Sequence, residues 1–128
     1  MNAQASSGPS RRVAVIGLGS MGYGMAVSLK RAGYAVAGFD VRQEAVERFV
    51  AEGGLGAATP GEAAAGADAV VSVVLNAEQT EAVLFGEGGC AATMAEGAVF
   101  ISSATMAPSI ARALAKRLEA TGRHYLDA

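Results

Sequence analysis

The sequence has few of the residues that build disulfide frameworks and metal centres. Its 128 residues include one cysteine, Cys90, and one histidine, His124. A single cysteine excludes an internal disulfide and is typical of a reducing compartment, so we expect a cytoplasmic protein. Without a cluster of cysteine and histidine, no structural zinc site is expected. Cys90 itself is predicted to be a small buried or loop residue.

The sequence also lacks an excess of charge and a long apolar run. Ten basic and twelve acidic residues give a formal net charge of −2, which does not favour binding to nucleic acid. No apolar run approaches the roughly 20 residues that span a bilayer, so we expect no membrane partner. The opening MNAQASSGPSRR lacks the apolar core of a signal peptide, and residues 1–11 are predicted to form a disordered arm.

Glycine and apolar residues are abundant instead. The chain contains seventeen glycines and only three prolines, and 52% of its residues are hydrophobic. This composition indicates a packed fold with many tight turns and enough apolar material for one core. We therefore predict a single domain over residues 12–128.

Strand and helix patterns alternate along that domain. Short β-branched runs predict buried strands, and apolar residues at helical spacing predict helices. We expect strands at 13–16, 35–39, 69–75, 98–101 and from 125, and helices at 21–32, 42–52, 60–66, 78–84 and 108–122. Alternation with short connections predicts parallel strands joined by right-handed crossovers, which is a Rossmann-like, doubly wound α/β fold.

The stretch after the first predicted strand carries most of the functional information. VAVIGLGSMGYGMA places Gly17, Gly19 and Gly22 in the pattern G-x-G-x-x-G, between a strand and a helix. The first glycine would allow the tight turn, the second would let backbone N–H groups approach a pyrophosphate, and the third would let the helix pack closely. The alternative is a turn that binds no ligand. The intervening positions of the predicted phosphate-binding loop are Leu18, Ser20 and Met21.

An acid follows at the end of the second predicted strand. Asp40 lies 18 residues after Gly22, where a carboxylate can accept both ribose hydroxyls of an adenosine and would repel a 2′-phosphate. NAD is therefore favoured over NADP. Arg42 could bind that phosphate or stack on the adenine. The alternative role for Asp40 is to cap the helix that begins at residue 42.

These motifs resemble the β-hydroxyacid dehydrogenase family, which includes 3-hydroxyisobutyrate dehydrogenase, tartronate semialdehyde reductase and relatives of 6-phosphogluconate dehydrogenase. G-L-G-S-M-G-Y-G-M-A looks like its N-terminal signature, and VVLNAEQTEAVLFGEGG and ISSATMAP are similar to its threonate dehydrogenase branch. The resemblance runs from about Arg12 to Ala128. It implies an oxidoreductase that transfers hydride between a nicotinamide cofactor and a small hydroxy acid, such as the sugar acid threonate.

The resemblance also implies cofactor contacts beyond the glycine loop. Leu75–Asn76 takes the place of the family's Leu-Pro pair beside the cofactor ribose, and Thr80 matches a later contact. The family's Asp-Ser-Ser-Thr-x-x-Pro loop becomes SSATMAP at 102–108, with serine in place of the acid. Thr105 keeps the position near the nicotinamide. Alternatively, the hydroxyls of this loop only cap the helix opened by the proline.

Hydride transfer also needs a group to move the hydroxyl proton and a site for the carboxylate. By resemblance, the family supplies a lysine on a later helix and a Ser-Gly-Gly loop in the motif Asp-Ala-Pro-Val-Ser-Gly-Gly, of which Asp127–Ala128 would be the start. Lys30 and Lys116 lie at solvated helix positions, and His124 lies at the amino end of the last strand. We therefore expect no catalytic residue and no metal ligand in the chain.

The chain is thus expected to be the cofactor-binding part of an enzyme whose all-helical second domain is absent, with a homo-oligomer expected for the full-length enzyme. Two alternatives also use a glycine loop. A regulatory Rossmann module binds NAD without turnover, and a chain without the catalytic lysine would behave in that way. An S-adenosylmethionine-dependent methyltransferase is less consistent with the Met21 signature and with ISSATMAP.

Overall fold

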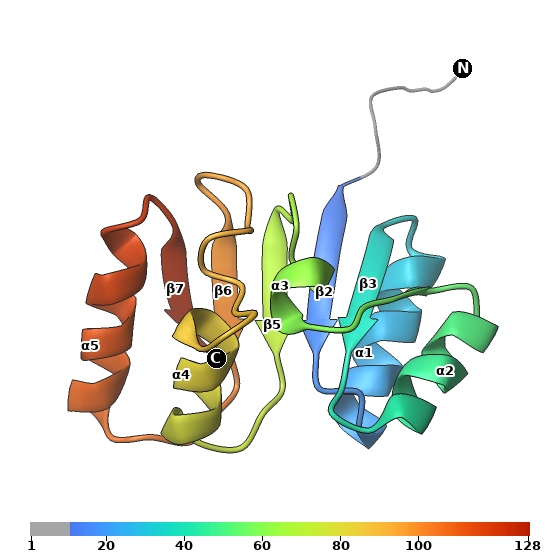
Figure 1. The fold of residues 1–128 in the computed structure, drawn as a ribbon, viewed down its shortest axis with the longest axis horizontal. Helices are drawn as coiled ribbons and strands as arrows, with labels where there is room; N and C mark the ends of the chain where they lie inside the picture. The colour runs from blue at the N-terminus through green and yellow to red at the C-terminus, as the bar shows by residue number, and fades with distance from the viewer. Residues whose placement is uncertain (1–10) are drawn as a thin grey trace.

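The computed structural model describes residues 11–128, and the predicted arm lies almost wholly outside this range (Figure 1). A single sheet holds all the strands of the described residues. The strands are β2 (Arg12–Ile16), β3 (Ala35–Phe39), β4 (Leu55–Gly56), β5 (Ala69–Ser72), β6 (Val99–Ser102) and β7 (His124–Asp127). The helices are α1 (Ser20–Arg31), α2 (Gln43–Ala51), α3 (Pro60–Ala63), α4 (Ala77–Phe85) and α5 (Pro108–Glu119).

The order of the strands creates a switch point in the middle of the sheet. The six strands lie in the order β4-β3-β2-β5-β6-β7, and every neighbouring pair is parallel. The chain builds outward from β2 through β3 to β4, then crosses back to β5 and builds outward in the other direction. The predicted doubly wound α/β fold is confirmed. In such sheets ligands bind where the order reverses, here beside the carboxyl ends of β2 and β5.

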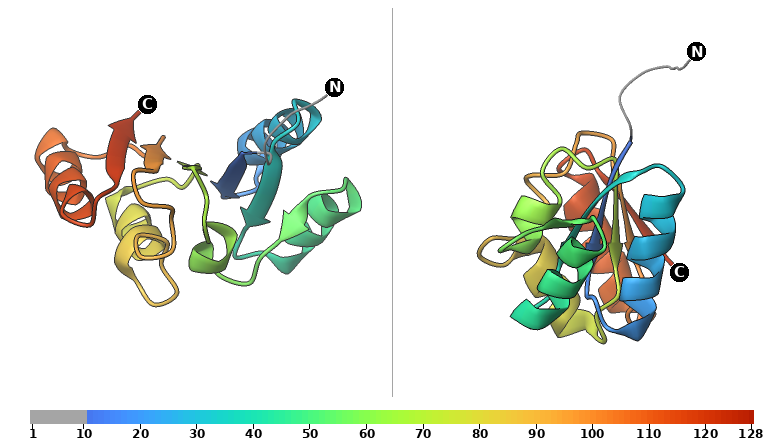
Figure 2. Two further views of the ribbon diagram at one scale, coloured as in Figure 1. Left: turned by 90° about the horizontal axis from the view of Figure 1, so that it is seen from above. Right: turned by 90° about the vertical axis from the view of Figure 1, so that its right-hand side faces the viewer.

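Two apolar layers cover the two faces of the sheet. In β2, Val13 and Val15 face a cluster formed with α1 and α2, while Ala14 and Ile16 face a cluster that includes residues of α3, α4 and α5. Figure 2 shows α1 on one side of the sheet and α3 and α4 on the other. Strands buried on both faces explain why the sequence shows unbroken apolar runs rather than alternation.

Several predicted element ends differ from the structure. The strand predicted to reach Leu75 ends at Ser72, where the paired strands β2 and β6 also end, at Ile16 and Ser102. The helix predicted over 60–66 is a single turn. The two-residue strand β4 was not predicted, since Leu55–Gly56 is too short to show a pattern.

Cys90 is fully buried, as predicted, and burial raises the pKa of its thiol to about 12. None of the helices among residues 11–128 combines the length and the apolarity that a bilayer span requires. Within the same range, no three side chains of histidine, cysteine, aspartate or glutamate gather in a way that could hold a metal ion.

Helix α1 begins in close contact with the end of β2. Gly17 has a φ of +99° and donates its N–H to the carbonyl of Phe39 (2.8 Å) at the end of β3. One turn into the helix, a Cβ on Gly22 would overlap the carbonyl oxygen of Gly17. Only glycine therefore lets α1 start this close to the strand. By contrast, a Cβ on Gly24 in the same helix would meet nothing within 4 Å.

This difference predicts opposite effects of the same substitution at two positions of α1. Gly22→Ala should destabilise the protein by about 2 kcal/mol or more, because the loop backbone must move. Gly24→Ala should stabilise it by up to about 1 kcal/mol through helix propensity. Thermal unfolding followed by circular dichroism measures both, with roughly 3 °C of midpoint shift per kcal/mol. Equal midpoints for the two variants would show that Gly22 is not closely packed.

Candidate functional site

A cleft of about 620 Å³ lies at the switch point, at the carboxyl ends of β2, β3 and β5. The segments that follow these three strands form its walls, and α4 forms a further wall. The lining residues include Gly17, Gly19, Asp40, Arg42 and Leu75 from the predicted site. The structure therefore brings together groups from three separate predicted loops.

The glycine loop leaves open space on the side of the cleft. A Cβ on Gly17 would come within 2.9 Å of the carbonyl oxygen of Val73, whereas a Cβ on Gly19 would meet only the Arg42 guanidinium, at 3.9 Å. Gly19 is the N-cap of α1, where no side chain caps the helix and no acid lies in the first turn. The first N–H groups of α1 are therefore suited to an anionic ligand, and a pyrophosphate fits this cradle.

The other three loop residues contribute differently from one another. The side chain of Leu18 is 2% exposed and packs over Gly38, so that only its backbone faces the acid at the end of β3. Ser20 and Met21 begin α1 and are exposed. Their side chains border a shallow groove on the far side of α1, beside Met25. These two residues can serve the cleft through their backbone N–H groups.

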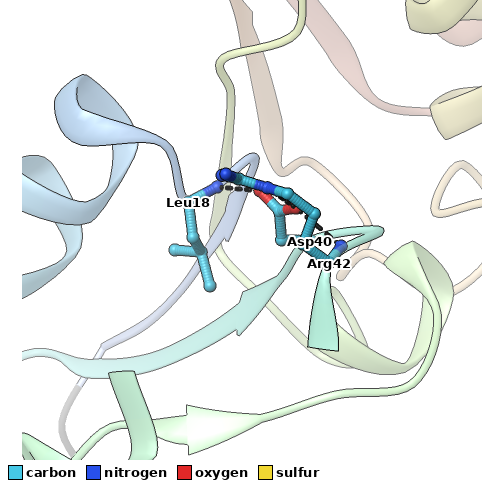
Figure 3. A network of polar contacts seen from close by, with 3 residues as sticks. All are labelled: Leu18, Asp40 and Arg42. Carbon is cyan, nitrogen blue, oxygen red and sulfur yellow. Dashed lines mark hydrogen bonds and ion pairs between the residues drawn. The ribbon is translucent and has the colours of Figure 1, made fainter. Parts of the chain in front are cut away.

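Asp40 joins the glycine loop to the segment after β3 (Figure 3). Its Oδ2 accepts a hydrogen bond from the Leu18 N–H (2.7 Å), and its Oδ1 accepts from the Arg42 N–H (2.8 Å). The Arg42 Nε also lies 3.3 Å from Oδ1. The N-cap of α2 is Arg42 and no side chain caps that helix, so the alternative role of Asp40 as its cap is wrong.

The hydrogen bonds keep Asp40 ionised. Partial burial acts to raise the pKa of Asp40, but the backbone N–H groups of Arg42 and Leu18 and the Arg42 guanidinium lower it by more. The pKa of Asp40 therefore lies below its ordinary value of 3.8. Oδ1 already accepts two hydrogen bonds from Arg42, whereas Oδ2 accepts only the Leu18 N–H and keeps acceptor capacity. The charged form can thus also accept a hydroxyl group of a ligand at Oδ2.

Arg42 is the single cation among the residues that line the cleft. Its side chain is about half exposed, at 55%. Its guanidinium contacts the Asp40 carboxylate and lies 3.9 Å from where a Cβ on Gly19 would be. Because Arg42 is paired with Asp40, the positive charge at this end of the cleft is largely neutralised in the described structure.

The Leu75–Asn76 pair forms the rim of the cleft. Leu75 is 77% exposed, and the Asn76 side chain caps α4 by accepting from the Gln79 N–H (2.9 Å). Asn76 therefore has a structural role at a position where the resemblance led us to expect proline. Thr105 lies beside this pair, because its N–H donates to the Leu75 carbonyl (3.2 Å) and it forms an isolated bridge with Asn76.

The hydroxyls of the 102–108 loop do not cap the helix that follows. The N-cap of α5 is Ala107, and no side-chain hydrogen bond caps this helix, so the capping alternative is wrong. Instead, the Ser103 hydroxyl donates to the Ser72 carbonyl (3.0 Å), and the Ser102 hydroxyl accepts from the Ala104 N–H (3.3 Å). These bonds hold the loop against the end of β5 and leave Thr105 exposed.

Thr80 is not at the surface of the cleft. Its side chain is fully buried, and its hydroxyl donates to the carbonyl of Asn76 (2.8 Å) in the first turn of α4. The structure thus places Thr80 beneath the rim, as a brace for the helix start. In this conformation Thr80 can affect a ligand only indirectly, through the position of Asn76.

The sequence interpretation missed the wall of the cleft that α4 provides. Gln79, Ala82, Val83 and Glu87 line the cleft, together with Pro60 at the start of α3. The signal was present in part, since positions 79, 82 and 83 share one face of a helix. Lys30, Lys116 and His124 lie outside the cleft lining.

Comparison with known proteins gives one consistent result. The family described as the NAD binding domain of 6-phosphogluconate dehydrogenase matches residues 12–128. An L-threonate dehydrogenase from Cupriavidus necator is 50% identical over 119 residues, which are 93% of this chain and 40% of that protein. An NAD-dependent L-serine dehydrogenase from Pseudomonas aeruginosa is 36% identical over 92% of this chain and 40% of its own length.

The solved structures agree. The crystal structure of a 3-hydroxyisobutyrate dehydrogenase from Salmonella typhimurium superposes with a TM-score of 0.84 and 38% identity, over 91% of this chain and 40% of that one. The chain therefore spans about two fifths of the length of the relatives that it matches.

The lowered pKa of Asp40 predicts a pH-dependent contribution to stability. A carboxyl group whose pKa is depressed by folding stabilises the protein above its unfolded pKa, and this stability is lost as the pH falls through the folded pKa. The midpoint difference between the wild-type protein and Asp40→Asn should therefore be largest near about pH 7 and shrink below about pH 4. Thermal unfolding across this range measures it. A difference that stays constant with pH would contradict the assigned hydrogen bonds.

Proposed function

The chain belongs to the family of NAD-binding domains of 6-phosphogluconate dehydrogenase, and from this premise we propose that it binds NAD in the cleft at the carboxyl ends of β2, β3 and β5. The glycine loop and the first turn of α1 hold the pyrophosphate through backbone N–H groups. Asp40 accepts the hydroxyls of the adenosine ribose. The observation that carries this proposal is the position of Asp40, 2.7 Å from the loop N–H of Leu18 and on the lining of the cleft.

We propose that NAD is preferred to NADP. Asp40 carries a negative charge at the position where a 2′-phosphate would lie. Hydrogen bonds hold the pKa of Asp40 below its ordinary value, which favours the charged form. Because Arg42 is paired with Asp40, its guanidinium is already engaged by a carboxylate for which a 2′-phosphate would have to compete. The name of the Pseudomonas relative, an NAD-dependent enzyme, supports the same preference.

For the whole protein we propose a dehydrogenase of a small hydroxy acid, with a sugar acid such as threonate as the substrate. The similarity to L-threonate dehydrogenase supports this substrate class. The bound nicotinamide supplies the hydride acceptor. The residues of this chain bind and orient the cofactor, with Leu75 on the lining of the cleft and Thr105 hydrogen-bonded to it.

We further propose that proton transfer depends on a lysine outside residues 11–128. Within the described residues no lysine or histidine lines the cleft, and a hydroxyl oxidation needs a base within hydrogen-bond reach. The same observation favours the second candidate function, a module that binds NAD without turnover. An assay of turnover separates the two for a protein of the relatives' length.

The first prediction from this proposal concerns cofactor affinity. Calorimetry should show that the 128-residue chain binds NAD and binds NADP more weakly. Asp40→Ala should weaken NAD binding by about tenfold or more, since hydrogen bonds to a charged group are lost, and should narrow or reverse the preference over NADP.

Asp68→Ala provides the matched control. Asp68 also accepts a backbone N–H, from Arg12 (3.1 Å), but lies at the amino end of β5. Its removal should leave NAD affinity within about twofold of the wild-type value. The absence of NAD binding, or an equal loss of NAD and NADP binding in Asp40→Ala, would contradict the proposed site.

The second prediction concerns turnover. With threonate and a panel of other hydroxy acids, the 128-residue chain should reduce no NAD, because no lysine or histidine among residues 11–128 lines the cleft. A protein of the relatives' length that includes the family's lysine should show absorbance from NADH. Substitution of that lysine should abolish the signal without weakening NAD binding. Turnover by the 128-residue chain would show that a base within the described cleft had been overlooked.

A further inference from the structure

The wall of the cleft formed by α4 contains a polar group with no assigned role. Gln79, Ala82, Val83 and Glu87 line the cleft. Of these, Gln79 lies nearest the start of α4, and Glu87 follows the end of the helix at Phe85. It occupies the third position of the helix after the N-cap Asn76, whose Oδ1 accepts the Gln79 N–H (2.9 Å).

The side chain of Gln79 is oriented by the rim of the cleft. Its Oε1 accepts the N–H of Leu75 at 2.7 Å. Because a backbone N–H can only donate, the oxygen of the side-chain amide must face Leu75 and the nitrogen must face elsewhere. Within residues 11–128, the two N–H groups of Nε2 have no hydrogen-bond partner. The rim thus holds one half of the amide and leaves the other half as a donor.

The capping role alone does not require glutamine. At this helix position glutamate accepts the same backbone N–H and also interacts favourably with the positive end of the helix. What glutamine adds is a pair of donors without a charge. That difference matters in this cleft, because Asp40 and Glu87 already supply carboxylates and the Arg42 guanidinium is paired with Asp40.

An anionic ligand in the cleft therefore depends on neutral donors. The glycine loop supplies backbone N–H groups from the β2 side, and Gln79 supplies its amide from the α4 side. Gly17, Gly19 and Gln79 all line the same cleft. We propose that the Gln79 amide donates a hydrogen bond to a phosphate oxygen of the bound dinucleotide. This inference rests on the proposed function, NAD binding in this cleft.

Two substitutions separate the donor from the cap. Gln79→Glu keeps the acceptor for the Leu75 N–H, so its thermal midpoint should stay within about 1 °C of the wild-type value. It loses the donors, and its NAD dissociation constant should rise by about tenfold, with a clear rise remaining in high salt. Gln79→Met removes donor and acceptor without adding charge, and its NAD dissociation constant should rise by about fivefold.

Gln43 offers the matched control, because it is the first residue of α2 and is not part of the cleft lining. Gln43→Glu and Gln43→Met should bind NAD within about twofold of the wild-type protein. Titration with ADP and with adenosine tests the phosphate assignment: Gln79→Met should weaken binding of ADP and leave binding of adenosine unchanged.

The outcomes are distinct. If the wild-type chain binds NAD and both Gln79 variants bind it equally well, Gln79 is only a cap and the inference is overturned. An equal loss of ADP and adenosine binding in Gln79→Met would overturn the assignment to a phosphate oxygen. If the wild-type chain binds no NAD, the proposed function itself fails, which is a different result.

Discussion

The position of the glycine loop depends on hydrogen bonds made across the ends of two neighbouring strands. Gly17 donates to the carbonyl of Phe39, and Leu18 donates to the carboxylate of Asp40. Both acceptors belong to the end of β3 or to the residue directly after it. The buried Leu18 side chain, which packs over Gly38, adds an apolar contact to the same junction. The loop and the acid therefore reach a ligand with their spacing already set, which reduces the entropy that binding must overcome.

The opposite rim has an equivalent arrangement around α4. The Asn76 side chain accepts the Gln79 N–H, and the Gln79 side chain accepts the Leu75 N–H. The Thr80 hydroxyl donates to the carbonyl of Asn76, and the Leu75 carbonyl accepts the N–H of Thr105. A proline at position 76 could not supply the side-chain acceptor that caps α4 here. Asparagine at position 76 thus caps α4, and Gln79, which lies in the same network, lines the cleft.

The elements that follow from local patterns agreed closely with the structure. The strand at 35–39 has the predicted bounds, and the glycine loop lies between a buried strand and α1. The predicted and observed elements differ where contacts with distant segments determine the bounds of a strand. The strand after Ala69 stops at Ser72, although its apolar run continues to Leu75, because the sheet ends there and the chain turns into the rim of the cleft. β4 forms only because β3 offers an edge on which two residues can pair.

The sequence by itself determined the order of the helices and of every strand except β4, the doubly wound fold, and the positions of the glycine loop and Asp40. These follow from apolar periodicity and from the special conformations of glycine, which are properties of neighbouring residues. Only the tertiary structure decided the partners of each polar group: that Asp40 bonds to Leu18, that Thr80 is buried, and that Gln79 faces the cleft. A hydrogen bond or a cleft needs groups from segments far apart in the chain, and their distance is set by the packing of helices on the sheet.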